Sequence, residues 1–339
     1  MSNFATMVLV TGGTGFVGSH LLLQLVAQGE NVRAIYRNSI HIEKTKSVFS
    51  YYGKDVLFGH ISWIQADITD IPSMEIAFAD IKFVYHCAAF VSFDPKDEEK
   101  LRKINIEGTA NMVNLALAHG IEKFCHVSSI AALGDLHDHE TIITEETEWN
   151  PEKYHSDYAI SKYGAEMEVF RAQQEGLKIV ITNPGVIIGP GIKNESGEIF
   201  TKIRDGLRYY TKGTSGFTTV DDVVSILILL MKSEAANERY IAVNENISFD
   251  KLVNSIADNM NVKAPNAYAK KWMTEVAWRL DGIISALFLS KRKLSKATAK
   301  SLHSTDLYSN EKIIQTLDFK FGKMDSAIKT TAAFYANQK

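Results

Sequence analysis

A glycine-rich stretch near the start of the chain, MVLVTGGTGFVG at residues 7–18, constrains the fold more than any other feature. A short apolar run leads into glycines at positions 12, 15 and 18, and an apolar segment typical of a helix follows. We expect Gly12 to form the tight turn out of a strand, Gly15 to let the backbone approach a pyrophosphate, and Gly18 to let the helix pack against the sheet. The helix N-terminus would offer its N–H groups to the phosphates. The stretch therefore predicts a dinucleotide-binding turn, with a purely structural turn as the alternative.

Apolar strand-like runs alternate with helical patterns along the chain after this turn. A helix is expected at residues 19–28, a long helix at 96–119, and strands at 31–37, 60–70, 82–93, 122–130 and 176–191. This alternation predicts an α/β fold with a doubly wound, mostly parallel sheet of the Rossmann type. Ligands bind such sheets at the carboxyl ends of the strands.

The composition is that of an ordinary globular protein. Of the 339 residues 45% are hydrophobic and 23% charged, and the net charge of −3 gives no basic excess that would predict nucleic-acid binding. The two cysteines, Cys87 and Cys125, lie in apolar strand-like runs, so we expect small core residues rather than a disulfide or metal pair. Two cysteines without a predicted disulfide suit a reducing compartment, and because no signal peptide is evident we expect a cytoplasmic protein.

One segment raises the question of a membrane. No run reaches 18 uninterrupted apolar residues, so no integral span is expected. The segment most similar to a membrane span, residues 272–289, contains Glu275, Arg279 and Asp281 and is followed by a basic triplet at 291–293. We interpret it as an amphipathic helix of a substrate domain, and a helix lying on a membrane surface is the alternative.

The end of the second strand favours one nicotinamide cofactor over the other. NAD-binding folds place an acidic residue there to accept the ribose hydroxyls. This chain has Arg37 instead, with Lys44 seven residues further on. A cation at that point pairs with a 2′-phosphate, so we expect NADP(H), with NAD(H) as the alternative cofactor. The alternative interpretation of Arg37 is a solvated strand end.

The ends of the next two strands supply further cofactor candidates. Asp67 follows the third strand, placed to meet an adenine amino group or to cap the next helix, and Ile68 comes next. The fourth strand runs into Ala88 and Ala89, whose small side chains would let a cofactor lie against the backbone.

Tyr158 and Lys162 carry the predicted chemistry. They are four residues apart, so on a helix they share one face. An ammonium beside a phenol favours the phenolate, which suits a tyrosine for passing a proton to or from a carbonyl or alcohol oxygen. Ser129, at the end of the fifth strand, could hydrogen-bond the same oxygen. The alternative is a surface tyrosine with a neighbouring lysine.

The sequence resembles the extended short-chain dehydrogenase/reductase family, which includes nucleotide-sugar epimerases, dihydroflavonol reductases and 3β-hydroxysteroid dehydrogenases. The resemblance rests on TGGTGFVG at 11–18, Asp67, HCAA at 86–89, NIEGT at 105–109, SS at 128–129, YAISK at 158–162, NPGVIIGPG at 183–191 and GFTTVDDVV at 216–224. It implies a catalytic set of Ser129, Tyr158 and Lys162, with Lys162 also holding the nicotinamide ribose. Ser129 is preferred to Ser128 because it stands five residues before Gly134.

The resemblance also implies the remaining site residues. Asn105 would support the cofactor or a proton-relay water, and Pro184 would flank the nicotinamide. The cofactor candidates are Gly12, Thr14, Gly15, Phe16, Val17, Gly18, Arg37, Lys44, Asp67, Ile68, Ala88, Ala89, Ser128, Tyr158, Lys162 and Pro184. The family further implies a homodimer formed through two helices, one of them carrying Tyr158.

Within the family the chain resembles the dihydroflavonol-reductase and hydroxysteroid-dehydrogenase branch. Arg37 is similar to that branch's NADP-binding arginine, and the aromatic run AFVSF follows the fourth strand as it does there. Family epimerases usually have Asn where this chain has His86. Family dehydratases usually place acidic residues after the serine, where this chain has Ile130 and Ala131.

The resemblance implies two domains. The nucleotide-binding domain would comprise residues 1–184 and 216–243, and a smaller, mostly helical substrate domain residues 185–215 and 244–339. The second domain is rich in apolar and aromatic residues, most of them expected in its core: Phe200, Leu207, Tyr209, Tyr210, Tyr268, Trp272, Trp278 and Phe288. Arginines able to grip a diphosphate are few, mainly Arg204, Arg208 and Arg279. We therefore expect a small apolar or aromatic carbonyl or alcohol substrate.

The stretch GDLHDHE at residues 134–140 has side chains able to bind a metal, but no distant ligand set completes a site, so we expect a solvated loop and no metal.

Three functions stay open. The first is an NADP(H)-dependent oxidoreductase for ketones, aldehydes or alcohols. The second is a nucleotide-sugar epimerase or dehydratase with tightly held NAD(P), and the third is a non-catalytic NADP-sensing regulator.

Overall fold

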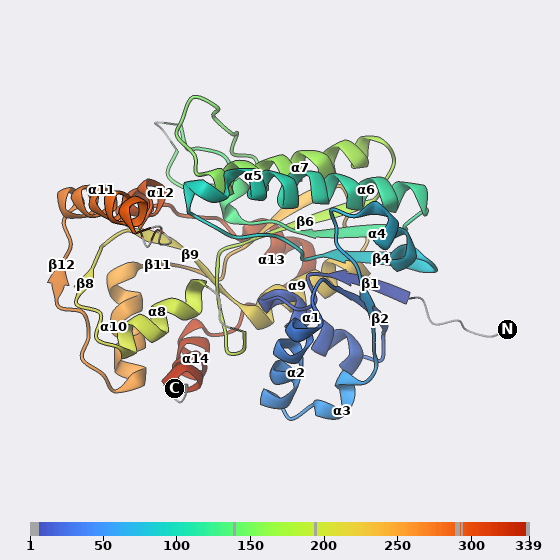
Figure 1. Cartoon of the computed structure of the whole chain (residues 1–339), viewed down its shortest axis with the longest axis horizontal. Coiled ribbons are helices and arrows are strands. Elements are labelled where there is room, and N and C mark those ends of the chain that lie inside the picture. The colour runs from blue at the N-terminus through green and yellow to red at the C-terminus, as the bar shows by residue number, and fades with distance from the viewer. Residues whose placement is uncertain (1–6, 138–139, 193–194, 289–291, 293, 337–339) are drawn as a thin grey trace.

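The computed structural model describes residues 7–137, 140–192, 195–288, 292 and 294–336. Within them, seven strands form one parallel sheet in the order β3, β2, β1, β4, β5, β6, β10 (Figure 1). The strands are β1 (Met7–Thr11), β2 (Asn31–Tyr36), β3 (Ile61–Gln65), β4 (Ile81–His86), β5 (Lys123–Val127), β6 (Ile179–Pro184) and β10 (Glu238–Ala242). The expected Rossmann-type parallel sheet is confirmed.

Helices cover both faces of this sheet (Figure 1). One face carries α4 (Ile71–Phe78), α6 (Gly108–Ala118) and α7 (Asp157–Gln174), and the other carries α1 (Phe16–Ala27), α2 (Ile42–Tyr51), α3 (Asp55–Phe58) and α9 (Val220–Lys232). Successive side chains of a strand point to opposite faces, so Val8 and Val10 enter one core while Leu9 enters the other. Because both faces are buried, the strands are rich in apolar residues and show no regular apolar–polar alternation.

Several elements differ from their predicted bounds. The helix after the glycine turn begins at Phe16, three residues before the predicted start, so Phe16 and Val17 form its first turn. The third and fourth strands end at Gln65 and His86, earlier than predicted. The chain beyond each of these two ends belongs to the cavity described below.

One predicted helix is continuous but irregular in its middle, and one predicted strand is wrong as a single unit. The helix expected at 96–119 consists of α5 (Glu98–Leu101), a π-helical stretch Arg102–Glu107 and α6. The strand expected at 176–191 is two strands in different sheets, β6 and β7 (Val186–Ile188). They separate at Gly185, where a Cβ atom would lie 2.4 Å from the carbonyl oxygen of Gly216. The chain therefore turns out of the first sheet where two backbones pass in close contact.

The later part of the chain forms a smaller, mostly helical body with its own core. A three-stranded sheet orders β11 (Glu245–Ser248), β9 (Thr214–Thr219) and β7, and a two-stranded sheet pairs β8 (Tyr209–Tyr210) with β12 (Ala267–Tyr268). Helices α8 (Glu195–Arg204), α10 (Phe249–Met260) and α14 (Met324–Ala336) surround a core that includes Phe200, Ile256 and Tyr335. The remaining helices are α11 (Lys271–Leu287), α12 (Lys296–Ser301) and α13 (Glu311–Leu317). No described helix has the length and apolar character needed to cross a membrane.

The two cysteines are free thiols in different surroundings. Cys125 is fully buried in β5, as expected. Cys87, just after the last residue of β4, is partly buried and packs against the core, and it also lines the cavity at the carboxyl end of the sheet.

Candidate active site

The turn between β1 and α1 requires its glycines. Gly12 has a φ angle of 68°, and a Cβ atom on it would lie 2.6 Å from the backbone nitrogen of Ala88. A Cβ atom on Gly18 would lie 2.2 Å from the carbonyl oxygen of Gly12, so α1 packs on the turn itself. Gly15 is exposed and immediately precedes α1. The first N–H groups of α1 therefore border an open backbone, which is the geometry that binds phosphates.

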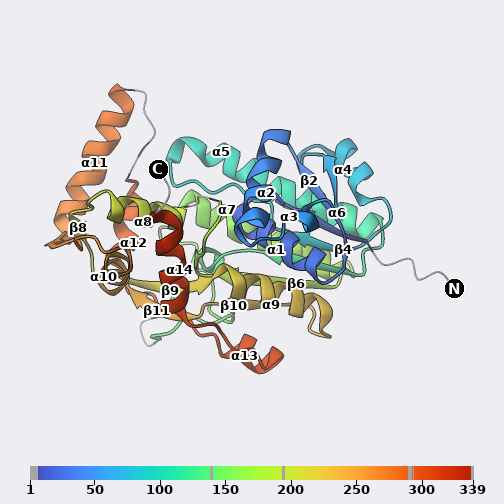
Figure 2. The ribbon, with the colours of Figure 1, turned by 90° about the horizontal axis from the view of Figure 1, so that it is seen from below.

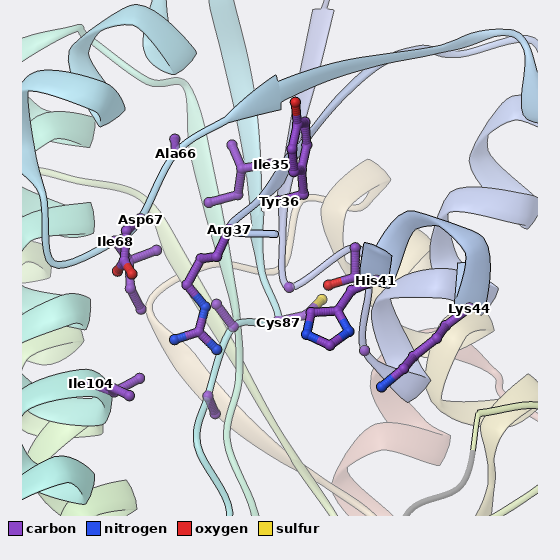
Figure 3. A pocket seen from close by; sticks show the side chains of 15 residues that line it. Ile35, Tyr36, Arg37, His41, Lys44, Ala66, Asp67, Ile68, Cys87 and Ile104 are labelled. Carbon is purple, nitrogen blue, oxygen red and sulfur yellow. The ribbon is translucent and has the colours of Figure 1, made fainter. Parts of the chain in front are cut away.

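A cavity of about 270 Å³ opens beside this turn, at the carboxyl ends of β1, β2 and β4 (Figure 3). Its lining brings together nine predicted residues: Gly12, Thr14, Gly15, Arg37, Lys44, Asp67, Ile68, Ala88 and Ala89. Six lining residues were not predicted: Ile35, Tyr36, His41, Ala66, Cys87 and Ile104. Phe16, Val17 and Gly18 lie in the first turn of α1, which follows directly on the glycine turn that lines the cavity.

Three basic or potentially basic side chains gather at the end of β2. Arg37 follows the strand, and His41 and Lys44 come from the chain that turns back after it (Figure 3). The turn is made by Asn38, whose side-chain oxygen accepts a 3.0 Å hydrogen bond from the N–H of Ile40. This capped turn is the signal in the sequence that could have added His41 to the site.

Asp67 occupies the opposite wall of the cavity. Its Oδ1 accepts hydrogen bonds from the N–H and the hydroxyl of Thr69, at 2.9 and 2.8 Å. In the next helix, α4, the N-cap position is Asp70, so the alternative interpretation of Asp67 as the helix cap is wrong. Ile68 is buried with its side chain against Gly108, where any larger residue would collide with it.

Tyr158 and Lys162 lie one turn apart on α7, as predicted. The helix is capped by Ser156, whose hydroxyl accepts a 3.1 Å hydrogen bond from the N–H of Ala159. Lys162 is buried, and its Nζ donates a 2.8 Å hydrogen bond to the carbonyl oxygen of Val127. Burial lowers the pKa of Lys162 to about 8. The half-buried ring of Tyr158 packs edge-on against Phe93, with 5.5 Å between ring centroids.

Ser128 and Ser129 follow β5 but differ in exposure. Ser128 is buried, and its N–H donates a 2.8 Å hydrogen bond to the carbonyl oxygen of Thr182. Ser129 is partly exposed and begins a short 3₁₀ turn, its hydroxyl accepting a 3.1 Å hydrogen bond from the N–H of Ala131. A substrate could reach the Ser129 hydroxyl more readily than that of Ser128.

Asn105 connects the cavity wall to the tyrosine helix. It is buried in the π-helical stretch, and its side-chain nitrogen donates 2.9 Å hydrogen bonds to the carbonyl oxygen of Phe90 and the hydroxyl of Ser161. Its oxygen accepts a 2.7 Å hydrogen bond from the N–H of Phe90. The Ser161 hydroxyl in turn donates to the carbonyl oxygen of Tyr158. Both N–H donors of the Asn105 amide are therefore used within the protein.

Glu166 is a buried residue that the sequence interpretation missed. It lies one turn beyond Lys162 on α7 and is fully buried. Asn183 donates a 2.5 Å hydrogen bond to its Oε1, and Arg239 approaches Oε2 at 3.2 Å. Burial raises the pKa of Glu166, and hydrogen bonds and the Arg239 charge oppose that rise. Asn183 also donates to the carbonyl oxygen of Ser129, so this cluster supports the end of β5 as well.

Pro184 and His86 have structural surroundings. Pro184 is buried as the last residue of β6, opposite Ala242 of β10. His86 is buried between Thr11 and Thr109, whose hydroxyls lie 2.8 and 3.0 Å from its two ring nitrogens. Burial, aided by the nearby Lys162 charge, lowers the pKa of His86 to about 3. The neutral imidazole thus joins β1, β4 and α6 beneath the site.

The acidic and histidine-rich loop is satisfied by local contacts. Asp135 lies 3.3 Å from His155, and the carboxylate of Glu140 accepts a 2.9 Å hydrogen bond from the N–H of His137. Asp138 and His139 lie outside the described residues. Among the described side chains, no group of three or more His, Cys, Asp or Glu residues could hold a metal ion.

Residues 8–244, from β1 past β10, match the NAD dependent epimerase/dehydratase family. The chain belongs to this family. Members of the epimerase/dehydratase family that resemble it carry both reductase and epimerase names. A Synechocystis protein, provisionally named a dihydroflavonol 4-reductase, is 29% identical over 98% of this chain and 95% of its own length. Sterol demethylase protein B of Methylococcus capsulatus is 29% identical over 72% of each chain. The UDP-glucose 4-epimerase of Vibrio cholerae is 25% identical over 74% of each.

Solved structures of the same fold cover nearly the whole chain. The protein gox2253 is 25% identical and has a TM-score of 0.81, with 97% of this chain and 98% of that chain covered. A UDP-glucose 4-epimerase from Thermotoga maritima has a TM-score of 0.75 at 20% identity over 97% and 98% of the two chains. The protein is thus an NAD(P)-dependent oxidoreductase of the extended short-chain dehydrogenase/reductase type.

Proposed function

We propose that the protein is an NADP(H)-dependent oxidoreductase that interconverts a ketone or aldehyde and an alcohol, with Tyr158 as proton donor and acceptor. The observation that carries this proposal is the arrangement on α7. Tyr158 lies one turn before the buried Lys162, and Lys162 is bonded to the last residue of β5, two residues before Ser129. The hydrogen bond from Lys162 to Val127 thus joins α7, which carries the phenol and the ammonium group, to the end of β5, after which the Ser129 hydroxyl follows.

The residues present fit a dinucleotide cofactor. Gly12 lets the turn pack directly against the backbone of Cys87 and Ala88, where a Cβ atom would collide, and Gly15 leaves the start of α1 open. Gly12, Thr14, Gly15 and the first turn of α1 would hold the pyrophosphate, Asp67 and Ile68 the adenine side, and Ala88 and Ala89 the middle of the cofactor. When bound, the nicotinamide supplies or accepts the hydride. Ser128 and Pro184 would border the nicotinamide end of the site.

The proton chemistry belongs to three side chains of this protein. The Tyr158 hydroxyl gives a proton to the substrate oxygen in reduction and takes one in oxidation. Protonated Lys162 stabilises the phenolate that remains on Tyr158. Ser129 hydrogen-bonds the substrate oxygen and holds it in reach. Asn105 acts as a positioning residue, because its amide fixes Ser161 and the Phe90 segment.

The preference for NADP(H) rests on the end of β2. Arg37, His41 and Lys44 line the same part of the cavity, and the strand is followed by Arg37 and Asn38 rather than by a carboxylate. An arginine and a lysine there favour a 2′-phosphate, which an acidic residue would repel.

The substrate we propose is apolar or aromatic. Two of the three arginines available to a diphosphate are engaged, since Arg204 donates to the carbonyl oxygen of Tyr335 and Arg279 pairs with Glu275. Arg208 lies over the ring of Tyr209. The names of two relatives, a sterol demethylase protein and a tetraketide alpha-pyrone reductase, also support such a substrate.

Domain division and assembly are part of the same proposal. Residues 1–184 with 216–243 would bind the cofactor, and residues 185–215 with 244–339 would bind the substrate. A homodimer would form through two helices, one of them α7. Sedimentation of the purified protein, with and without NADPH, tests the assembly.

The test of the proposed reaction is a product assay with purified protein and NADPH. Aromatic and alicyclic ketones and aldehydes form one panel, and UDP-sugars form the other. We expect an alcohol from a carbonyl compound, with one NADPH consumed per alcohol formed. Conversion of a UDP-sugar without net NADPH consumption would support the epimerase alternative instead. Biological activity that survives Tyr158→Phe with no catalysis at all would support the regulator.

A further inference from the structure

Helix α11 (Lys271–Leu287) has a face of large apolar side chains that is exposed to solvent. Among the α11 side chains that the structure describes, Thr274 and Ser285 are buried, at 7% and 3% exposure, and Thr274 is hydrogen-bonded to His303 at 2.9 Å. The large apolar side chains at exposed positions are Trp272, Val276, Leu280, Ile283, Ile284 and Leu287, continued by Phe288, and each is between 47% and 75% exposed. A surface helix of a globular protein usually has the opposite arrangement, with its apolar side chains toward the core and its polar side chains toward water.

The exposed side chains form one continuous stripe. Their spacings of three and four residues place them on a single helical face. Four of the aromatics expected in the core of the substrate domain are exposed, and two of these, Trp272 and Phe288, mark the two ends of this stripe, contrary to that prediction. Figure 2 shows α11 projecting at the edge of the molecule, with its far end clear of the other elements. We call this set of seven side chains the α11 stripe.

The chain around the α11 stripe is strongly basic. Residues 263–300 contain nine Lys or Arg and two Asp or Glu, a net charge of +7, whereas the whole chain carries −3. Lys270 and Lys271 lie at the start of the helix, and Lys296 and Lys300, both exposed, belong to α12 packed beside it. The positive charge of the protein is thus concentrated where its apolar surface is exposed.

We propose that the α11 stripe binds the surface of an anionic lipid bilayer, with the helix lying in the plane of the interface. Exposed Trp, Phe, Leu and Ile side chains enter the boundary between headgroups and acyl chains, and the flanking lysines meet the acidic headgroups. A second copy of the chain is the less suitable occupant, because a two-fold contact would bring two segments of charge +7 together. Lys271, Glu275, Arg279 and Asp281 within the helix fit a surface position rather than a span.

The experiment is co-sedimentation of the full-length protein with vesicles. One set contains phosphatidylcholine alone, and the other contains phosphatidylcholine mixed with phosphatidylglycerol. We expect binding to the anionic vesicles at least ~10-fold tighter than to the neutral ones, and weakened by added salt. The triple variant Leu280→Ser, Ile283→Ser, Leu287→Ser should bind the anionic vesicles at least ~10-fold more weakly than the wild type.

Matched controls separate this surface from general stickiness. Val56 and Ile76 are exposed apolar residues far from α11, at 85% and 66% exposure, so Val56→Ser with Ile76→Ser should leave vesicle binding unchanged. A second variant, Lys270→Gln with Lys271→Gln, keeps the apolar stripe and should weaken binding to anionic vesicles alone. NADPH binding, unchanged in every variant, reports that each one is folded.

Three results would overturn the proposal. The first is wild-type protein that stays in the supernatant with anionic vesicles. The second is a triple variant that sediments as the wild type does. The third is a wild-type dimer that binds no vesicles and that the triple variant converts to monomers, which would make the α11 stripe a subunit interface.

Discussion

The ammonium group of Lys162 donates a 2.8 Å hydrogen bond to the backbone carbonyl oxygen of Val127. This bond joins the middle of α7 to the last residue of β5. Tyr158 lies one turn before the donor, and Ser129 lies two residues after the acceptor. This buried hydrogen bond therefore fixes the position of the Tyr158 phenol relative to the Ser129 hydroxyl, and both groups would contact the same substrate oxygen.

The pH dependence of reduction should follow Lys162. Its pKa is lowered to about 8 by burial, and the charge of Glu166 works against that shift. As the pH rises through about 8, Lys162 loses its proton and can no longer stabilise the phenolate that forms on Tyr158. We therefore expect kcat/KM for carbonyl reduction to fall. Glu166→Gln removes the charge that raises the Lys162 pKa, so the falling limb should move to lower pH by up to about one unit. The pH profile of kcat/KM measures this shift.

Glu168→Gln is the control for that profile. Glu168 is two residues away on the same helix and pairs with Arg171 on the partly exposed side. Its substitution should leave the limb in place. If the falling limb of the pH profile lies at the same pH for Glu166→Gln and wild type, then Glu166 does not change the pKa of Lys162.

Arg37→Ala should weaken NADPH binding by about 10- to 100-fold, the loss of one charge-assisted contact. NADH binding should stay within about threefold, because NADH has no 2′-phosphate for Arg37 to contact. Fluorescence titration with each cofactor measures both effects. Lys46→Ala is the matched control, since Lys46 is an exposed cation on α2 that does not line the cavity. Equal losses for the two cofactors would remove Arg37 from the 2′-phosphate site.

Asn105→Ala should lower the free energy of unfolding by about 2 kcal/mol. The substitution leaves three partners without their bonds to the amide: the partly buried N–H and carbonyl of Phe90 and the buried hydroxyl of Ser161. Chemical denaturation measures the change. Asn114→Ala, at an exposed position on α6 where the amide oxygen accepts from Arg171, should cost less than about 0.5 kcal/mol. A cost for Asn105→Ala no larger than that would contradict the role of this amide.

The parts of the site that follow from local rules were predictable. Gly12 needs a positive φ angle, and the periodicity of a helix places Tyr158 one turn before Lys162. The apolar runs identified the strands because both faces of the sheet are buried, which leaves no polar alternation to read.

The parts that depend on distant contacts were not predictable. Glu166 is tied to Arg239, 73 residues away, and the strand that carries Arg239, β10, was not identified. His41 lines the cavity only because the capped turn at Asn38 brings the chain back to the sheet. Asn105 lies in a π-helical stretch and bonds to Phe90 and Ser161, and helix propensity along the chain indicates neither the stretch nor these bonds.

The most direct test of the account compares two tyrosines of α7. Tyr158→Phe removes the proposed proton donor, whereas Tyr163→Phe keeps the ring that stacks on Trp149, at 4.4 Å between centroids. We predict that Tyr158→Phe lowers the rate of NADPH-dependent alcohol formation by about 100- to 10,000-fold with NADPH affinity unchanged, and that Tyr163→Phe stays near the wild-type rate. A Tyr158→Phe variant that forms alcohol at the wild-type rate would contradict the central claim.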